Sequence, residues 1–60
     1  MARLSKSVLI KKILNLLNLY EINNIKMRTY LKKESLDTLE MMTWYTKEEL
    51  KQYVDSKGVN

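Results

Sequence analysis

The sequence offers almost no residues from which a tight turn can be built. It contains no proline, and its single glycine lies at position 58. Hairpin turns and phosphate-binding loops depend on glycine, because glycine readily adopts a positive φ angle. A chain of 60 residues without such turns is largely limited to helices joined by short polar connections. We therefore predict an all-α fold, a compact bundle of three to four short helices that forms a single small domain over residues 1–60.

Two residue types on which catalysis and metal binding often depend are absent. The chain has no cysteine and no histidine, which excludes disulfides, thiolate ligands and an imidazole base. The remaining carboxylates are accounted for by helix capping and surface pairs, and the spacing of an EF-hand is missing. We predict a protein that is not an enzyme and that has no cofactor, no metal site and no small-molecule substrate.

Charge is distributed unevenly along the chain. Residues 1–33 carry eight basic side chains and one acidic side chain, a net charge of +7, whereas residues 34–60 carry three basic and six acidic ones, a net charge of −3. Such asymmetry favours a molecule whose N-terminal half faces an anion. A basic surface that is merely solvated explains the same counts.

The sequence does not indicate a membrane protein. Lys11 and Lys12 interrupt the apolar run of the first 20 residues, and no stretch approaches the roughly 18 apolar residues of a membrane span. The amphipathic N-terminal segment suits a membrane surface in outline, but the acidic second half would be repelled by anionic lipid. We expect a cytoplasmic protein without membrane contact.

A first helix is predicted from Ser5 or Ser7, either of which can act as the N-cap, to Tyr20. Its apolar arc covers about 160° of the helical wheel and comprises Leu9, Ile10, Ile13, Leu14, Leu16, Leu17 and Tyr20. Its clearly polar sector is narrow and comprises Ser7, Lys11, Asn15 and Asn18. A helix this apolar is the central helix of the bundle, or part of it forms an interface with a second copy or a partner, and the two explanations are compatible.

The remaining chain divides into two or three helices. Asn23 and Asn24 favour a break, followed by a short helix over residues 24–33. Its apolar positions are Ile25, Met27, Tyr30 and Leu31. A third helix over residues 36–45 begins at the N-cap Ser35 and carries a stripe made of Leu36, Leu39 and Met42.

The sharpest local signal is a capping box formed by Thr46 and Glu49. It starts the last helix, residues 47–57, whose buried positions are Leu50, Tyr53 and Val54. Gly58 lies where a left-handed C-cap belongs. Residues 43–46 are poor helix formers, which favours a break between the last two helices.

Residues 46–59 resemble one helix of the SAP-like and Rho-N-type helix-extension-helix modules, with the pattern T-x-x-E-L-x-x-x-h-x-x-x-G-h. The matching residues are Thr46, Glu49, Leu50, Val54, Gly58 and Val59. In those modules a second helix follows the glycine and helps to bind nucleic acid. The resemblance covers about a quarter of the chain, and no function is carried over from it.

One hypothesis is direct DNA binding through the basic N-terminal half. The candidate nucleic-acid-binding residues are Lys26, Arg28, Thr29, Lys32 and Lys33, with Arg3 and Lys6 as further phosphate contacts. Asn23 and Asn24 add residue types that read base edges. The short helix over residues 24–33 would then be the reading element, with the first helix behind it.

The other hypothesis is binding to a larger protein. The candidate partner-binding residues are Met41, Met42, Trp44 and Tyr45, four large apolar side chains within five residues. Aromatic residues dominate interface hot spots, and methionine adapts to irregular partners. Closure of the small core is the competing explanation of this cluster.

From the sequence we favour the function of a small basic regulatory protein that binds and modulates a larger protein. In one version of this hypothesis the larger protein is itself bound to DNA. The composition is similar to that of accessory regulators of phages and mobile elements. A homodimer is a further expectation. Direct DNA binding through the basic N-terminal half is the alternative.

Overall fold

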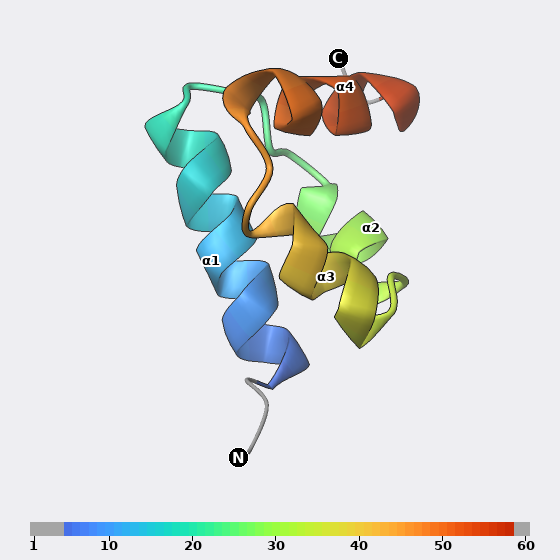
Figure 1. The fold of residues 1–60 in the computed structure, drawn as a ribbon. Coiled ribbons are helices and arrows are strands. Elements are labelled where there is room, and N and C mark those ends of the chain that lie inside the picture. Colours follow the sequence, from blue (N-terminus) through green and yellow to red (C-terminus); the bar gives the residue numbers. More distant parts are fainter. Residues whose placement is uncertain (1–4, 59–60) are drawn as a thin grey trace.

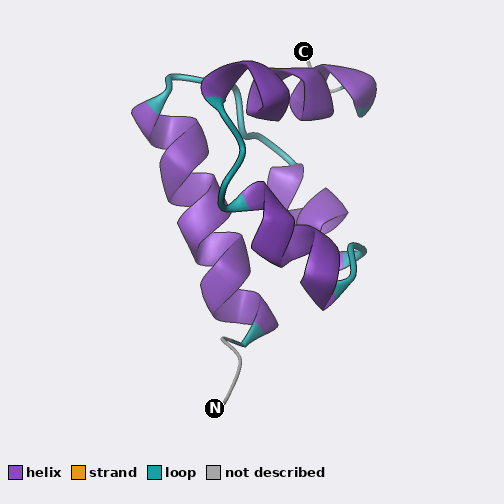
Figure 2. Ribbon diagram, viewed as in Figure 1, coloured by secondary structure: helices purple, strands orange, loops and turns teal. Residues whose placement is uncertain are grey.

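The computed structural model describes residues 5–58. Within this range the chain forms four helices and no strand, which confirms the predicted all-α bundle (Figures 1 and 2). The helices are α1 (Lys6–Leu19), α2 (Met27–Lys32), α3 (Leu36–Met42) and α4 (Lys47–Ser56).

The longest helix, α1, is the centre of the arrangement. Both α2 and α3 pack along it, and these are the most extensive contacts between helices among the described residues. The last helix, α4, lies across the end of the bundle at which α1 finishes (Figure 1). Of the two explanations for the wide apolar arc of α1, the central position is therefore the one observed, while the homodimer stays a prediction.

All four helices contribute to one hydrophobic core. The buried side chains are Leu9, Ile10, Ile13, Leu17, Met27, Leu31, Leu39, Met42, Leu50 and Val54. No polar or charged side chain of the described residues is buried. The core is therefore apolar throughout, and every polar group that carries function has to lie at the surface.

Three of the four helices begin at a hydroxyl side chain. Ser5, Ser35 and Thr46 each accept a hydrogen bond from the backbone N–H three residues further on. Thr46 and Glu49 form both hydrogen bonds of the predicted capping box. A cap of this kind stabilises a helix by about 0.5–2 kcal/mol, so these starts are determined locally.

The start of α2 differs from the prediction, because the helix begins at Met27 instead of residue 24. The side-chain Oδ1 of Asn23 accepts a hydrogen bond of 3.0 Å from the Ile25 N–H, and this turn competes with a helix. Lys26 then adopts a left-handed conformation with φ 69°, and no side chain caps the helix. As a consequence Ile25, one of the apolar positions of the predicted helix, lies before the helix and is 67% exposed.

The break between α3 and α4 occurs earlier than the predicted end at residue 45. The Thr43 hydroxyl donates a hydrogen bond of 2.6 Å to the carbonyl of Glu40, and α3 ends at Met42. The two helices are therefore separate, as the poor helix formers of residues 43–46 indicate. At the other end of α4, Gly58 has a φ of 69°, which confirms the predicted left-handed C-cap.

A polar contact fastens α4 to the connection between α2 and α3. The Tyr53 hydroxyl donates a hydrogen bond of 2.5 Å to Oε2 of Glu34. The ammonium group of Lys57 lies 3.7 Å from the same carboxylate oxygen and 4.9 Å from the centroid of the Tyr53 ring. Burial and the Glu34 hydrogen bond both raise the pKa of Tyr53. Tyr53, expected in the core, is half-buried so that its hydroxyl reaches this partner.

In the part of the chain that the structure describes, no helix combines the length and the apolar character that crossing a lipid bilayer requires.

Candidate nucleic-acid interface

The basic residues of the N-terminal half are brought together because α2 runs back along α1. At one end, the Nζ of Lys6 donates a hydrogen bond of 2.6 Å to the backbone carbonyl of Lys32. At the other end, the Nδ2 of Asn24 donates a hydrogen bond of 2.5 Å to Oδ1 of Asn18. The start of α1 therefore lies beside the end of α2, and the two helices are antiparallel.

A groove of about 440 Å³ lies between α1 and the segment that leads into α2. We call it the basic groove. It is lined by Lys11, Leu14, Asn15, Asn18, Asn24, Lys26 and Arg28. Lys11, Asn15 and Asn18 recur at intervals of four and three residues, so they share one face of α1. The other wall is formed by residues 24–28.

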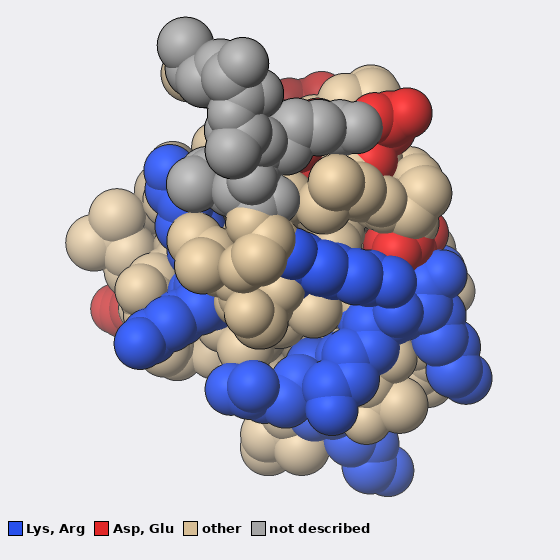
Figure 3. Space-filling model, turned by 90° about the horizontal axis from the view of Figure 1, so that it is seen from below, with Lys and Arg blue, Asp and Glu red and all other residues tan. Residues whose placement is uncertain are grey.

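The basic groove is positively charged because its lining contains no carboxylate. Three of its lining residues are basic and three carry a carboxamide. Among residues 5–33 the one acidic side chain is Glu21, and it lines a different hollow. At the end at which α1 begins, which is not the end at which Asn18 meets Asn24, Lys and Arg side chains also gather over one part of the surface (Figure 3). Such a concentration of charge attracts polyanions.

The five predicted nucleic-acid-binding residues are all exposed, but the structure does not place them in one site. Lys26 and Arg28 line the basic groove. Lys32 lies beside Lys6 at the end of α2. Thr29 and Lys33 are outside the lining of the groove, four residues apart on α2 and its C-cap. Of the two further phosphate contacts that the sequence indicates, Arg3 lies outside the described residues.

Half of the basic groove was missed in the sequence-based site. Lys11, Asn15 and Asn18 belong to its α1 wall, yet the prediction included none of these three residues in the site. The signal was present in the narrow polar sector of the first helix. The prediction placed this helix behind the reading element, because the sequence alone does not reveal that α2 packs beside that sector.

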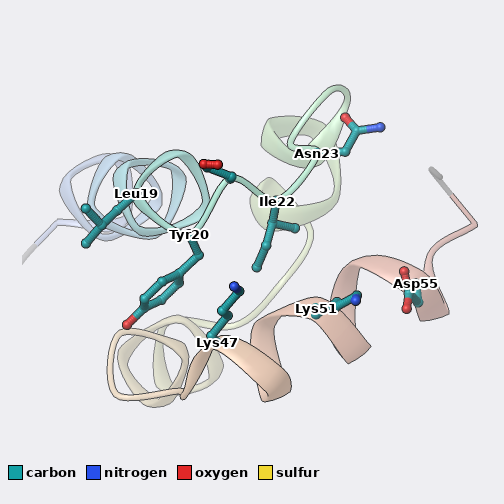
Figure 4. A pocket seen from close by; sticks show the side chains of 8 residues that line it. Leu19, Tyr20, Ile22, Asn23, Lys47, Lys51 and Asp55 are labelled. Carbon is teal, nitrogen blue, oxygen red and sulfur yellow. The ribbon is translucent and has the colours of Figure 1, made fainter.

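A second hollow, which we call the α1–α4 cleft, has a volume of about 520 Å³. It is lined by Leu19, Tyr20, Glu21, Ile22, Asn23, Lys47, Lys51 and Asp55 (Figure 4). Lys47 and Lys51 lie four residues apart on α4, and Lys47 points toward Tyr20 and Ile22 (Figure 4). Their charges are balanced by Glu21 and Asp55, so the cleft has no net charge in its lining.

The predicted partner-binding residues fall into two groups. Trp44 is 87% exposed and Met41 is 60% exposed. Tyr45 is half-buried against the core, and Met42 is a core residue with 1% exposure. Met42 is therefore not available to a partner, whereas Trp44 and Met41 do not help to close the core.

Comparisons with protein-family models, curated proteins and solved structures find no match to this chain. Among residues 5–58, no three side chains of the types His, Cys, Asp and Glu are grouped closely enough to hold a metal ion. The matches to the SAP-like and Rho-N-type pattern lie in α4 and its two caps, except for Val59, which lies outside the described residues.

Proposed function

We propose that this protein is a non-enzymatic nucleic-acid-binding protein that attaches to a duplex through the basic groove and the cations around it. The observation that carries the proposal is the composition of the groove, in which Lys11, Lys26 and Arg28 are joined by three carboxamides and by no carboxylate. Basic side chains supply the phosphate contacts that dominate affinity for nucleic acids. Carboxamides are among the groups that contact base edges.

A duplex fits this site better than a single strand. Proteins that bind single strands without sequence preference stack the bases on aromatic side chains. No aromatic residue lines the basic groove. The most exposed aromatic side chain of the described residues, Trp44, belongs to the acidic half of the chain. Phosphate contacts along a duplex require only cationic side chains, and the groove provides them.

The proposal predicts a strong dependence on salt. Neutralising a duplex phosphate releases counterions, so the logarithm of the binding constant falls with the logarithm of the salt concentration, with a slope of about −0.9 per contact. Four such contacts would lower the affinity by about 100-fold between about 50 and 200 mM salt. The measurement is the fluorescence anisotropy of a labelled random-sequence duplex.

A matched pair of variants tests where the duplex binds. Arg28→Ala with Lys32→Ala removes two exposed cations four residues apart on α2, and Lys47→Ala with Lys51→Ala does the same on α4. We expect the α2 variant to lose about two units of salt slope and at least tenfold in affinity, on the order of what two phosphate contacts contribute. The α4 variant should stay within about twofold of the parent. Equal losses, or no binding of the parent at about 50 mM salt, would exclude the basic groove.

The second candidate function is that of a regulatory adaptor that binds a larger protein through Trp44 and Met41. It is supported by the exposure of Trp44, because an exposed tryptophan is unusual on a free surface and frequent in interface hot spots. The two functions are compatible. The basic groove is built from α1, α2 and the segment between them, whereas Met41 and Trp44 lie in and directly after α3.

The adaptor function is tested with Trp44→Ala. Because the side chain lies outside the core, the variant should keep the helix content of the parent, measured by circular dichroism. When the parent is immobilised it should retain the larger partner protein, and the immobilised Trp44→Ala variant should not. Leu19→Ala, which removes another exposed apolar side chain, is the control that should retain it. If Trp44→Ala left the retention of the partner unchanged, this result would contradict binding of a partner through Trp44.

A further inference from the structure

The basic groove contains a hydrogen-bonded pair of carboxamides from two separate segments. Asn18 belongs to α1, and Asn24 to the connection that leads into α2. The Nδ2 of Asn24 donates to Oδ1 of Asn18, which fixes the orientation of both amide groups. Each carboxamide carries an NH₂ group and a carbonyl oxygen. The pair therefore presents the NH₂ group of Asn18 as a donor and the carbonyl oxygen of Asn24 as an acceptor.

This combination of one donor and one acceptor matches one edge of one base. In the major groove of DNA, adenine presents N7 as an acceptor beside the N6 amino group as a donor. A carboxamide that contacts both atoms distinguishes A·T from the other base pairs. Asn15 lies three residues before Asn18 on the same face of α1 and lines the same groove. It adds a third carboxamide about one helical turn away.

The dimensions favour α1 as the helix that enters the major groove. With 14 residues, α1 is about 21 Å long, whereas the six residues of α2 span about 9 Å. Lys11, Asn15 and Asn18 are exposed and form a strip along α1. Lys26 and Arg28, on the opposite wall, are placed to contact the phosphates. This reverses the assignment made from the sequence, in which the segment over residues 24–33 was the reading element.

We propose that Asn15, Asn18 and Asn24 form a strip that selects A·T pairs in the major groove of duplex DNA, with α1 as the reading helix. The inference rests on the proposed function, because it requires that the basic groove binds a duplex. The cations of the groove supply affinity for any sequence, and the three carboxamides supply the preference among sequences.

The test is a binding-site selection from a pool of random DNA duplexes with the full chain. The parent protein should enrich a short motif that contains adenine. Asn15→Ala and Asn18→Ala should each lower the ratio of affinities for the selected and the scrambled duplex by about tenfold, the size of a lost bidentate base contact. The salt slope should stay unchanged, because neither variant alters the charge of the protein. Gln52→Ala, which removes an exposed carboxamide from α4, is the matched control and should leave the ratio unchanged.

The possible results separate this inference from the proposed function. Binding to the random pool without any enriched sequence would overturn the selection of A·T pairs and leave duplex binding intact. Enrichment of a motif made of G·C pairs alone would overturn it as well. A preference for A·T pairs that survives both substitutions would do the same. Absence of binding to any duplex at low salt would overturn the proposed function itself. An RNA duplex of the selected sequence should bind without preference over its scrambled form, because the deep major groove of A-form RNA does not admit side chains to the bases.

Discussion

The central helix borders two hollows that both contain lysine side chains, and only one of them carries a net charge. The basic groove combines Lys11, Lys26 and Arg28 with carboxamides. In the α1–α4 cleft, Lys47 and Lys51 are accompanied by two carboxylates. The comparison of the two hollows shows that the number of basic side chains alone does not identify an anion site. The position of the acidic side chains decides which basic surface attracts a polyanion.

The two hollows also share a feature of the backbone. Each contains one residue other than glycine with a left-handed conformation, Lys26 with φ 69° in the basic groove and Glu21 with φ 59° in the cleft. For a residue with a β-carbon, this conformation costs about 1–2 kcal/mol of conformational free energy. At Lys26 a cation lines the groove at a position where glycine would be more stable.

The largest expected effect comes from the core that both hollows share. Leu50→Ala removes a fully buried side chain of α4 and should lower the free energy of unfolding by about 2–5 kcal/mol, through lost burial and a residual cavity. The measurement is denaturation by urea followed by circular dichroism, with the exposed neighbour Lys51→Ala as the control. If Leu50→Ala changed the free energy of unfolding by less than about 1 kcal/mol, α4 and the cleft would not belong to the same cooperative unit as the basic groove.

The second prediction introduces a carboxylate into the basic groove and so removes what distinguishes it from the cleft. Asn15→Asp should weaken duplex binding at low salt by about tenfold or more, because the added charge repels the phosphates within a Debye length. The control is Asn23→Asp, the same change in the lining of the cleft, where the new side chain can still accept the hydrogen bond from Ile25. Anisotropy titrations that gave equal losses for both variants would show that overall charge, and not the groove, determines binding.

The third prediction separates stability from function at Lys26. Lys26→Gly should raise the free energy of unfolding by up to about 1 kcal/mol, because glycine adopts the left-handed conformation without strain. It should also weaken duplex binding, because a cation of the groove is lost. Urea denaturation and anisotropy titration on the same preparation measure both effects. A variant that was both less stable and unchanged in binding would contradict the role assigned to this position.

The smallest effect concerns the contact that holds α4 in place beside the cleft. The pKa of Tyr53 is raised above its ordinary value of 10.0, so the folded state favours the protonated hydroxyl. The stability that this contributes is fully present below about pH 10 and is lost as the pH rises toward the raised pKa. The difference in free energy of unfolding between the parent and Tyr53→Phe should therefore shrink between about pH 10 and pH 12. A difference that stayed constant over this range would contradict the shift.

The local structure of this protein could be predicted from its sequence, and the exceptions have a common origin. The caps Ser35 and Thr46 and the terminal Gly58 were recognised, and Ser5 was one of two candidates for the first cap, because each depends on groups within a few residues. The start of α2 was placed three residues too early, because a side-chain turn at Asn23 and the backbone of Lys26 replace the expected helical turn. Competition between two local hydrogen-bonding patterns is not decided by propensity alone.

The local sequence therefore set the four helices, the caps of α1, α3 and α4 and the apolar faces, whereas the start of α2 was not foreseen. These properties follow from hydrogen bonds and from a helical period that involve residues at most four positions apart. Only the tertiary structure decided that Lys6 meets the end of α2 and that Asn18 meets Asn24. It also decided that the polar sector of α1 becomes one wall of the basic groove. The reason is that the packing of side chains from all four helices into one core sets which helix faces lie side by side.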